Sequence, residues 1–342
     1  MIKALIVEDS ATLRDMLVNI LSAHPDIEVL ATASNGRQAV EAVARLKPDV
    51  VTMDIHMPYL NGFEATQAIM ETHPLPIIVV SSTQSDDMVA TFRSIEAGAV
   101  AFVRRPYGMT DPRYEESAAH LVQTVLLMTQ VKVVRRWCKR TEIRKHAAPS
   151  VPLQAQPRDK IVAIGASTGG PVALQMIFSM LTKDFPLPIV VVQHMTPGFA
   201  QSFADWLGAT SKLLIGVAAD GIFPEPGHVY IAPDGAHMGV GAGGQIKLTA
   251  PPTGNGLCPS VSRLFQSIAE NYGASAIAII LSGMGADGAV ELKRLRDAGA
   301  TTIAQNQESS VVHGMPGAAI ATNGAAHVLA PDQIAALLLQ LA

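Results

Sequence analysis

Short apolar runs alternate with helix-like segments along most of the chain, and this alternation constrains the fold more than any other feature. After the apolar run 2–7, apolar residues repeat at helical spacing (Leu13, Met16, Leu17, Ile20 and Leu21). Further apolar runs follow at 49–53, 77–80, 99–103, 160–164, 189–192, 276–281 and 301–304. Strands that alternate with helices are typical of parallel sheets covered by helices. The sequence therefore predicts an α/β fold.

We expect two such units, joined by a linker. The chain has 342 residues, of which 49% are apolar and 16% charged, so two cores can form and extensive disorder is excluded. Between 141 and 159, prolines occur with few large apolar residues, which is typical of a linker. We predict a first domain over 1–125, a helix end and linker over 126–158, and a second domain over 159–342.

Composition excludes several classes of protein. Two cysteines cannot build a disulfide framework or a cysteine zinc site. No apolar run approaches 18 residues, and the first one ends at Glu8 and Asp9, so neither a membrane span nor a signal peptide is expected. A net charge of −4 argues against nucleic-acid binding, which requires an excess of positive charge. We therefore expect a cytoplasmic protein.

The basic stretch 132–145 is interpreted as a solvated helix end, with docking to an acidic receptor or membrane surface as the alternative.

Polar residues follow the predicted strands of the first domain. Glu8 and Asp9 follow the first strand and Asp54 follows another, and the ends of parallel strands meet at one edge of a sheet. Three carboxylates in one crevice repel each other unless a cation is present, and oxygen ligands suit Mg²⁺. Ser82 and Arg105 follow the next two strands and can offer a hydroxyl and a positive charge. The pattern favours phosphoryl transfer onto an aspartate, and solvated loop carboxylates are the alternative.

These motifs resemble those of a response-regulator receiver domain over roughly residues 1–108. The resemblance rests on Val7–Ser10, Met53–Pro58, Ser81–Thr83 and Phe102–Pro106. It implies a flavodoxin-like, doubly wound fold, with Asp54 as the phospho-acceptor and Glu8, Asp9 and Asp54 as Mg²⁺ ligands. It also implies Ser82 as the switch hydroxyl, Phe102 as the switch aromatic, and a histidine kinase as phosphodonor.

One departure from the pattern of that family bears on the switch. Arg105 stands where the family normally has lysine before the proline. Arginine keeps the positive charge, but its planar guanidinium is not a compact ammonium. Arg105 therefore either reaches the phosphoryl group differently or weakens the switch.

A second set of strand-end residues lies in the second domain. Residues 165–169 follow a predicted strand and match G-x-S-x-G, a sharp strand-to-helix turn that presents the hydroxyl of Ser167. His194 and Asp287 also follow predicted strands, so a nucleophile, a base and an orienting carboxylate are expected at one edge. The alternative is a phosphate cradle of a nucleotide-binding domain. That alternative lacks the P-loop lysine and the G-x-G-x-x-G spacing, and it leaves His194 and Asp287 unexplained.

Residues 160–342 resemble the catalytic domain of the chemotaxis protein-glutamate methylesterase (CheB) family. The resemblance rests on Ile164–Gly170, Val192–Met195, His228–Pro233, Pro259–Val261, Leu281–Gly288, Thr302–Gln305 and Ser309–Pro316. A receiver, a linker and this domain, in this order, are also the architecture of that family. The implied fold of the second domain is doubly wound α/β with a largely parallel sheet.

The resemblance implies Ser167 as nucleophile, His194 as base and Asp287 as orienting carboxylate. Met284 would supply an oxyanion-binding amide, and Thr168 would border the nucleophile. The implied substrates are glutamate methyl esters on the cytoplasmic helices of a chemoreceptor, cleaved to methanol without a cofactor, and some members deamidate glutamines as well. In the family the unphosphorylated receiver partly covers the hydrolase cleft.

The alternative to an active methylesterase is a catalytically silent signalling or binding module linked to a receiver.

Overall fold

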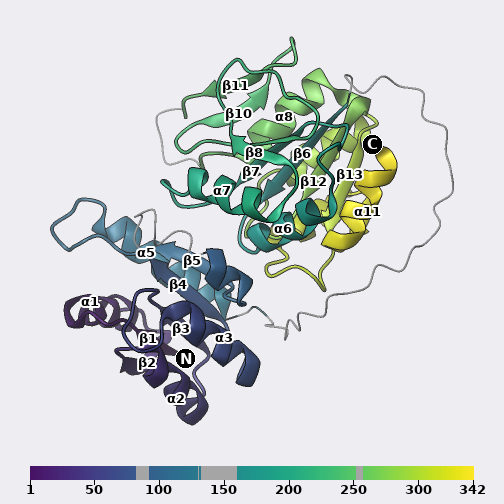
Figure 1. The fold of residues 1–342 in the computed structure, drawn as a ribbon. Helices are drawn as coiled ribbons and strands as arrows, with labels where there is room; N and C mark the ends of the chain where they lie inside the picture. The colour runs from purple at the N-terminus through teal and green to yellow at the C-terminus, as the bar shows by residue number, and fades with distance from the viewer. Residues whose placement is uncertain (82–91, 130, 132–159, 252–256) are drawn as a thin grey trace. The chain divides into compact units, whose positions relative to one another are not determined.

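The computed structural model describes residues 1–81, 92–129, 131, 160–251 and 257–342. These residues form two compact units, Met1–Cys138 and Lys139–Ala342, and in both units helices and strands alternate (Figure 1). Ser82, most of the predicted linker and the basic stretch lie outside the described residues. Within the described part of the chain, no helix is long and apolar enough to cross a membrane.

The first unit is built on a five-stranded parallel sheet of order β2-β1-β3-β4-β5. Its strands are β1 (Ile2–Val7), β2 (Ile27–Ala33), β3 (Val50–Met53), β4 (Ile77–Ser81) and β5 (Ala101–Arg104). Its helices include α1 (Ala11–Ser22), α2 (Gly36–Leu46), α3 (Gly62–Thr72) and α5 (Tyr114–Met128). This strand order is the predicted flavodoxin-like arrangement. Its topological switch point, where such sheets bind ligands, lies between β1 and β3.

The start of α3 shows how local sequence sets the edge of this sheet. Asn61 and Glu64 form a capping box, in which the side chain of each accepts a hydrogen bond from the backbone N–H of the other. A Cβ added to Gly62 would lie 2.1 Å from the backbone oxygen of Asp54. Only glycine therefore allows α3 to begin directly against the loop that follows β3.

The second unit is built on a seven-stranded sheet of order β14-β13-β12-β6-β7-β9-β8, and every pairing within it is parallel. Its strands are β6 (Ile161–Ala166), β7 (Ile189–Gln193), β8 (Leu214–Val217), β9 (His228–Ile231), β12 (Ala276–Ile280), β13 (Thr301–Gln305) and β14 (His327–Leu329). An antiparallel hairpin, β10 (His237–Val240) and β11 (Ile246–Thr249), forms a separate small sheet. The switch point lies between β6 and β12.

Helices cover both faces of this sheet. They are α6 (Gly170–Met180), α7 (Ala200–Thr210), α8 (Val261–Asn271), α9 (Ala289–Asp297), α10 (Gly314–Ala321) and α11 (Pro331–Leu341). Helix α6 packs against α7 and α11, and α8 packs against α9. Strands β6, β7 and β12 are buried at every position, as expected for parallel strands that have helices on both faces.

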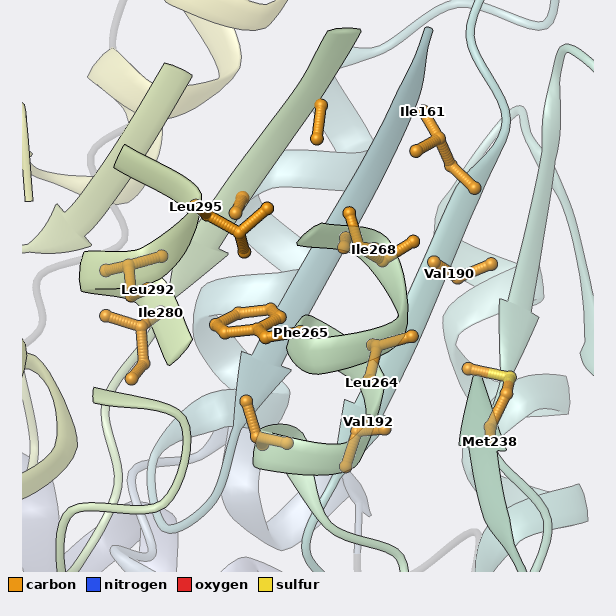
Figure 2. Packing of buried hydrophobic residues seen from close by; sticks show 14 of the residues in the cluster. Ile161, Val190, Val192, Met238, Leu264, Phe265, Ile268, Ile280, Leu292 and Leu295 are labelled. Carbon is orange, nitrogen blue, oxygen red and sulfur yellow. The ribbon is translucent and has the colours of Figure 1, made fainter. Parts of the chain in front are cut away.

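The core on one face of the sheet is centred on α8 (Figure 2). The cluster combines Leu264, Phe265 and Ile268 of α8 with Ile161, Val190, Val192 and Ile280 of the sheet, Leu292 and Leu295 of α9, and Met238 of β10. Burial of each such side chain stabilises the fold by about 1.5–3 kcal/mol. This packing fixes α8, whose first turn reaches the candidate active site.

Candidate active site and acidic pocket

Three adjacent strands of the second unit end at the candidate active site. Ser167 follows β6, His194 follows β7, and Asp287 lies in the loop after β12; β6 is the strand between the other two. The backbone N–H of His194 donates to the oxygen of Ala166 at 2.8 Å, and that of Ser167 donates to the oxygen of Ser282 at 3.0 Å. These bonds continue the pairing of β6 with its neighbours beyond the strand ends, so the three residues meet at one edge.

The carboxylate of Asp287 is held between the histidine and the first turn of α8. Its Oδ2 lies 2.9 Å from His194 Nε2 and accepts the backbone N–H of Val261 at 2.7 Å. Its Oδ1 accepts the backbone N–H of Ser262 at 3.0 Å and the hydroxyl of Ser260 at 3.1 Å. The positive end of a helix dipole stabilises an anion at this position.

This environment keeps Asp287 ionised. Burial acts to raise the pKa of Asp287, but the hydrogen bonds from His194 and Ser262 outweigh burial and hold that pKa well below its usual range. Because the carboxylate faces Nε2, it favours the tautomer with the proton on Nε2 and leaves Nδ1 as the basic nitrogen. Among the described residues, no hydrogen bond joins the Ser167 hydroxyl to His194, and such bonds often tighten only when substrate binds.

The loop after β12 lies directly against the turn that carries Ser167. A Cβ added to Gly283 would lie 2.7 Å from Ser167 Cβ, so only glycine fits there. Gly169 closes the turn with φ of 80°, a conformation that favours glycine. The backbone N–H groups of Thr168 and Met284 donate no hydrogen bond within the described part of the chain. Both amides are therefore available to donate a hydrogen bond to a bound ligand.

The acidic residues of the first unit meet at its switch point. One carboxylate oxygen from each of Glu8, Asp9 and Asp54 lies within 4.8 Å of the others. Glu8 and Asp54 are buried, whereas Asp9 is exposed. Burial, together with the charge of Asp54, raises the pKa of Glu8 to about 7, and burial also raises the pKa of Asp54. Among the described residues, the buried Oε2 of Glu8 has no hydrogen-bond partner, so this oxygen-rich pocket fits a hard cation such as Mg²⁺.

Two arginines act on the acidic pocket. Arg105 follows β5, and its Nη2 lies 2.9 Å from Asp54 Oδ1 and 3.5 Å from Glu8 Oε2. The sequence predicted a positive charge at this position. Arg14 was not predicted; its Nη1 donates to the backbone oxygen of Glu8 at 2.8 Å and thereby fixes the loop after β1. Phe102, the proposed switch aromatic, is half-buried and meets Phe92 edge to face with ring centroids 5.7 Å apart.

Replacing Glu8 by glutamine is expected to stabilise the protein in metal-free buffer at pH 8. Between about pH 4.5, the ordinary pKa of a glutamate, and about pH 7, the folded chain keeps a proton on Glu8 that the unfolded chain has lost. Wild-type stability therefore falls as the pH rises through this window. Above pH 7 the advantage of Glu8→Gln should reach about 3 kcal/mol, and below pH 4.5 it should vanish.

Urea unfolding in EDTA at several pH values measures this difference. Glu28→Gln is the matched control, because Glu28 is exposed on β2. An advantage of Glu8→Gln that did not change with pH would contradict the explanation. Added Mg²⁺ is expected to stabilise the wild type more than Glu8→Gln.

Several residues at the active site were not predicted from the sequence. Ser260 and Ser262 bind the carboxylate of Asp287, and the sequence offered only the Pro-Ser-Val motif as a signal for them. The side chain of Gln193 contacts the backbone of both Ser167 and His194. These contacts depend on which strands are neighbours, which the linear pattern does not specify.

Comparisons with known proteins agree with this architecture. Residues 162–338 match the family model described as CheB methylesterase, and residues 4–112 match that of the response regulator receiver domain. Protein-glutamate methylesterase/protein-glutamine glutaminase 4 of Geobacter metallireducens is 53% identical over 100% of this chain and 99% of its own length. The enzyme of the same name numbered 1 from Syntrophus aciditrophicus is 47% identical, with the same two coverages.

A solved structure supports the assignment of the second unit. The crystal structure of the Thermotoga maritima CheB methylesterase catalytic domain matches with a TM-score of 0.52 and 44% identity, covering 54% of this chain and 98% of that chain. The fold, the residues at the strand ends and these similarities together define a protein in which a receiver domain precedes a methylesterase domain with a parallel α/β sheet. The chain belongs to the CheB methylesterase family.

Proposed function

We propose that this protein hydrolyses glutamate methyl esters on chemoreceptors, deamidates receptor glutamines, and is controlled by phosphorylation of Asp54. The relatives carry the names of a protein-glutamate methylesterase and a protein-glutamine glutaminase. The observation that carries the proposal is the carboxylate of Asp287 bound to His194 beside the Ser167 turn. We propose domain limits of 1–125 and 159–342. We also propose that the protein acts in the cytoplasm, where the proposed substrate helices and the proposed kinase lie.

In the first half of the reaction, Ser167 is acylated. Its Oγ attacks the ester carbonyl carbon while its proton passes to Nδ1 of His194, a step worth about 10²–10⁴-fold. The oxyanion accepts hydrogen bonds from the amides of Met284 and Thr168, and each such donor contributes about 10²–10³-fold. The bond to the methoxy oxygen then breaks, and methanol leaves with the proton from His194. Asp287 stabilises the imidazolium throughout.

In the second half, water regenerates the enzyme. A water molecule gives one proton to His194 and attacks the acyl carbon, and the bond to Ser167 breaks as the serine recovers its proton. The product is a glutamate side chain. With glutamine as substrate, ammonia leaves in place of methanol and the remaining steps are the same.

The receiver domain would receive the phosphorylation signal. Asp54 would accept a phosphoryl group from a histidine kinase, with Ser82 and Phe102 as the switch residues. Glu8, Asp9 and Asp54 would hold Mg²⁺, which supplies positive charge for the phosphoryl oxygens when bound. The guanidinium of Arg105 already contacts Asp54 and would bind the same phosphoryl group.

Methanol release from methylated chemoreceptor membranes tests the proposal. We expect Ser167→Ala to reduce release to background, and Ser179→Ala, an exposed serine on α6, to leave it unchanged. Acetyl phosphate should raise release by the wild type but not by Asp54→Ala. Release that depends on Ser167 and ignores acetyl phosphate would contradict the regulatory part. No release by the wild type from a receptor that it binds would instead favour the catalytically silent module.

A further inference from the structure

Gln193 is the last residue of β7 and directly precedes His194. The residue is 3% exposed. Its Nε2 donates to two backbone oxygens, that of Ser167 and that of His194, and both distances are 2.8 Å. A single amide group thus connects the turn that carries the nucleophile with the turn that carries the base.

The backbone of Ser167 is held on two sides. Its N–H donates to the oxygen of Ser282 at 3.0 Å, on the segment that runs from β12 towards Asp287. Its carbonyl oxygen accepts from Gln193 and also from the N–H of Gly170 at 2.8 Å. The peptide groups of the nucleophile are therefore bound to both segments that carry the other two catalytic residues.

Stability alone does not explain a glutamine at this position. The Oε1 atom of Gln193 is buried and has no hydrogen-bond partner among the described residues, which is unfavourable for a polar atom. A Cβ added to Gly170 would lie 2.2 Å from this oxygen, so the helix start leaves no space for any side chain there. An apolar side chain of the same shape would avoid the unsatisfied oxygen, but it could not hold the two carbonyl groups.

We propose that Gln193 is a positioning residue for ester hydrolysis, which sets the separation of Ser167 and His194 by binding both of their backbone carbonyl groups. The inference rests on the catalytic roles proposed above for those two residues. Reaction requires the nucleophile and base in a near-attack geometry, and a displacement of about 1 Å can cost about 10²-fold in rate. A residue that acts only on this geometry affects kcat more than KM.

The test compares two amide side chains that make the same type of contact. Nδ2 of Asn271, at the end of α8, also donates to two backbone oxygens, those of Val240 and Ser267, each at 2.9 Å. We expect Gln193→Met to lower kcat for methanol release about 10- to 100-fold, with KM within about twofold. Asn271→Leu should leave both parameters unchanged. The labelling rate of Ser167 by a fluorophosphonate should fall by the same factor as kcat in Gln193→Met.

The outcomes separate this inference from the proposed function. Absence of methanol release by the wild type would overturn the proposed function itself. A wild type that is active while Gln193→Met keeps its kcat and labelling rate would overturn only the positioning role. An equal loss of kcat in Asn271→Leu would also overturn it, because the loss would then reflect general destabilisation. If the methionine variant does not fold, Gln193→Leu, which also lacks a donor, carries the same expectation.

Discussion

Replacing Asp287 by asparagine is expected to lower kcat for ester hydrolysis about 10⁴-fold and to leave KM within about twofold. Asp287 Oδ2 faces His194 Nε2, and Oδ1 faces the Ser262 N–H and the Ser260 hydroxyl. Every one of these groups donates when His194 carries its proton on Nε2. The NH₂ group of asparagine must therefore face a donor, or force His194 into the tautomer with the proton on Nδ1. In that tautomer the histidine cannot accept the proton of Ser167.

The matched control for this substitution is Asp297→Asn at the end of α9, where the carboxylate pairs with Lys293 on the surface. That pair contributes about 0–1 kcal/mol, so activity should not change. Because the pKa of Asp287 is held below its usual range, its contribution to stability is present above about pH 4 and is lost only as the pH falls through the lower folded value. The activity profile between pH 6 and 9 should therefore not report Asp287. A kcat for Asp287→Asn within tenfold of the wild type would contradict this role.

Replacing Gly283 by alanine is expected to lower kcat at least about 10²-fold. The new methyl group would lie 2.4 Å from Met315 Sδ and 2.7 Å from Ser167 Cβ. The backbone cannot easily move away, because the Gly283 N–H donates to Val312 and its oxygen accepts from the N–H groups of Gly314 and Met315. The clash must therefore displace the nucleophile or the adjacent amide of Met284.

Gly208→Ala is the control for this second substitution. Gly208 lies in α7, and an added Cβ would meet no atom within 4 Å. Alanine in a helix is more stable than glycine by up to about 1 kcal/mol, so Gly208→Ala should keep kcat and slightly raise the melting temperature. If Gly283→Ala hydrolysed receptor esters at the wild-type rate, the contact between the two loops would have no catalytic role.

The sequence predicted the α/β class and most of the strands that carry functional residues. Strands such as β1 and β3 are short apolar runs, and the residues after them are polar, so both the element and its functional end could be recognised. The same pattern identified His194 after β7. Because parallel strands place such ends at one edge of the sheet, the sequence pattern alone was enough to group the candidate residues.

Other elements lacked a clear signal. Strand β2 is interrupted by Glu28 and Thr32 and has only its two end positions buried, so it gives no continuous apolar run. Strand β8 lies in an apolar run that was not recognised as a strand, and none of its positions is buried. The antiparallel hairpin β10–β11 was also missed, because Gly239 interrupts β10 and Lys247 interrupts β11, so neither strand is a continuous apolar run. Of the helix end and linker predicted over 126–158, the structure describes only the last residues of α5, which ends at Met128, and Thr129 and Val131.

The hydrogen bonds that surround the candidate catalytic residues could not be predicted for a different reason. The hydrogen bonds of Gln193 and Ser260 depend on strand order and on the placement of α8, which arise from packing of the whole domain. Nothing in the local sequence distinguishes these side chains from other buried or capping residues. Ser260, for example, also has the ordinary role of an N-cap, since its side chain accepts from the N–H of Arg263.

The acidic pocket draws all of its residues from the first unit, and the serine, histidine and aspartate all come from the second. Within the described ranges, no side chain belongs to both sites. Mutation can therefore tune the response to a phosphodonor without altering ester cleavage, and recombination can exchange one unit as a whole. Because each site lies at the edge of its own sheet, signal reception and catalysis can change separately in evolution.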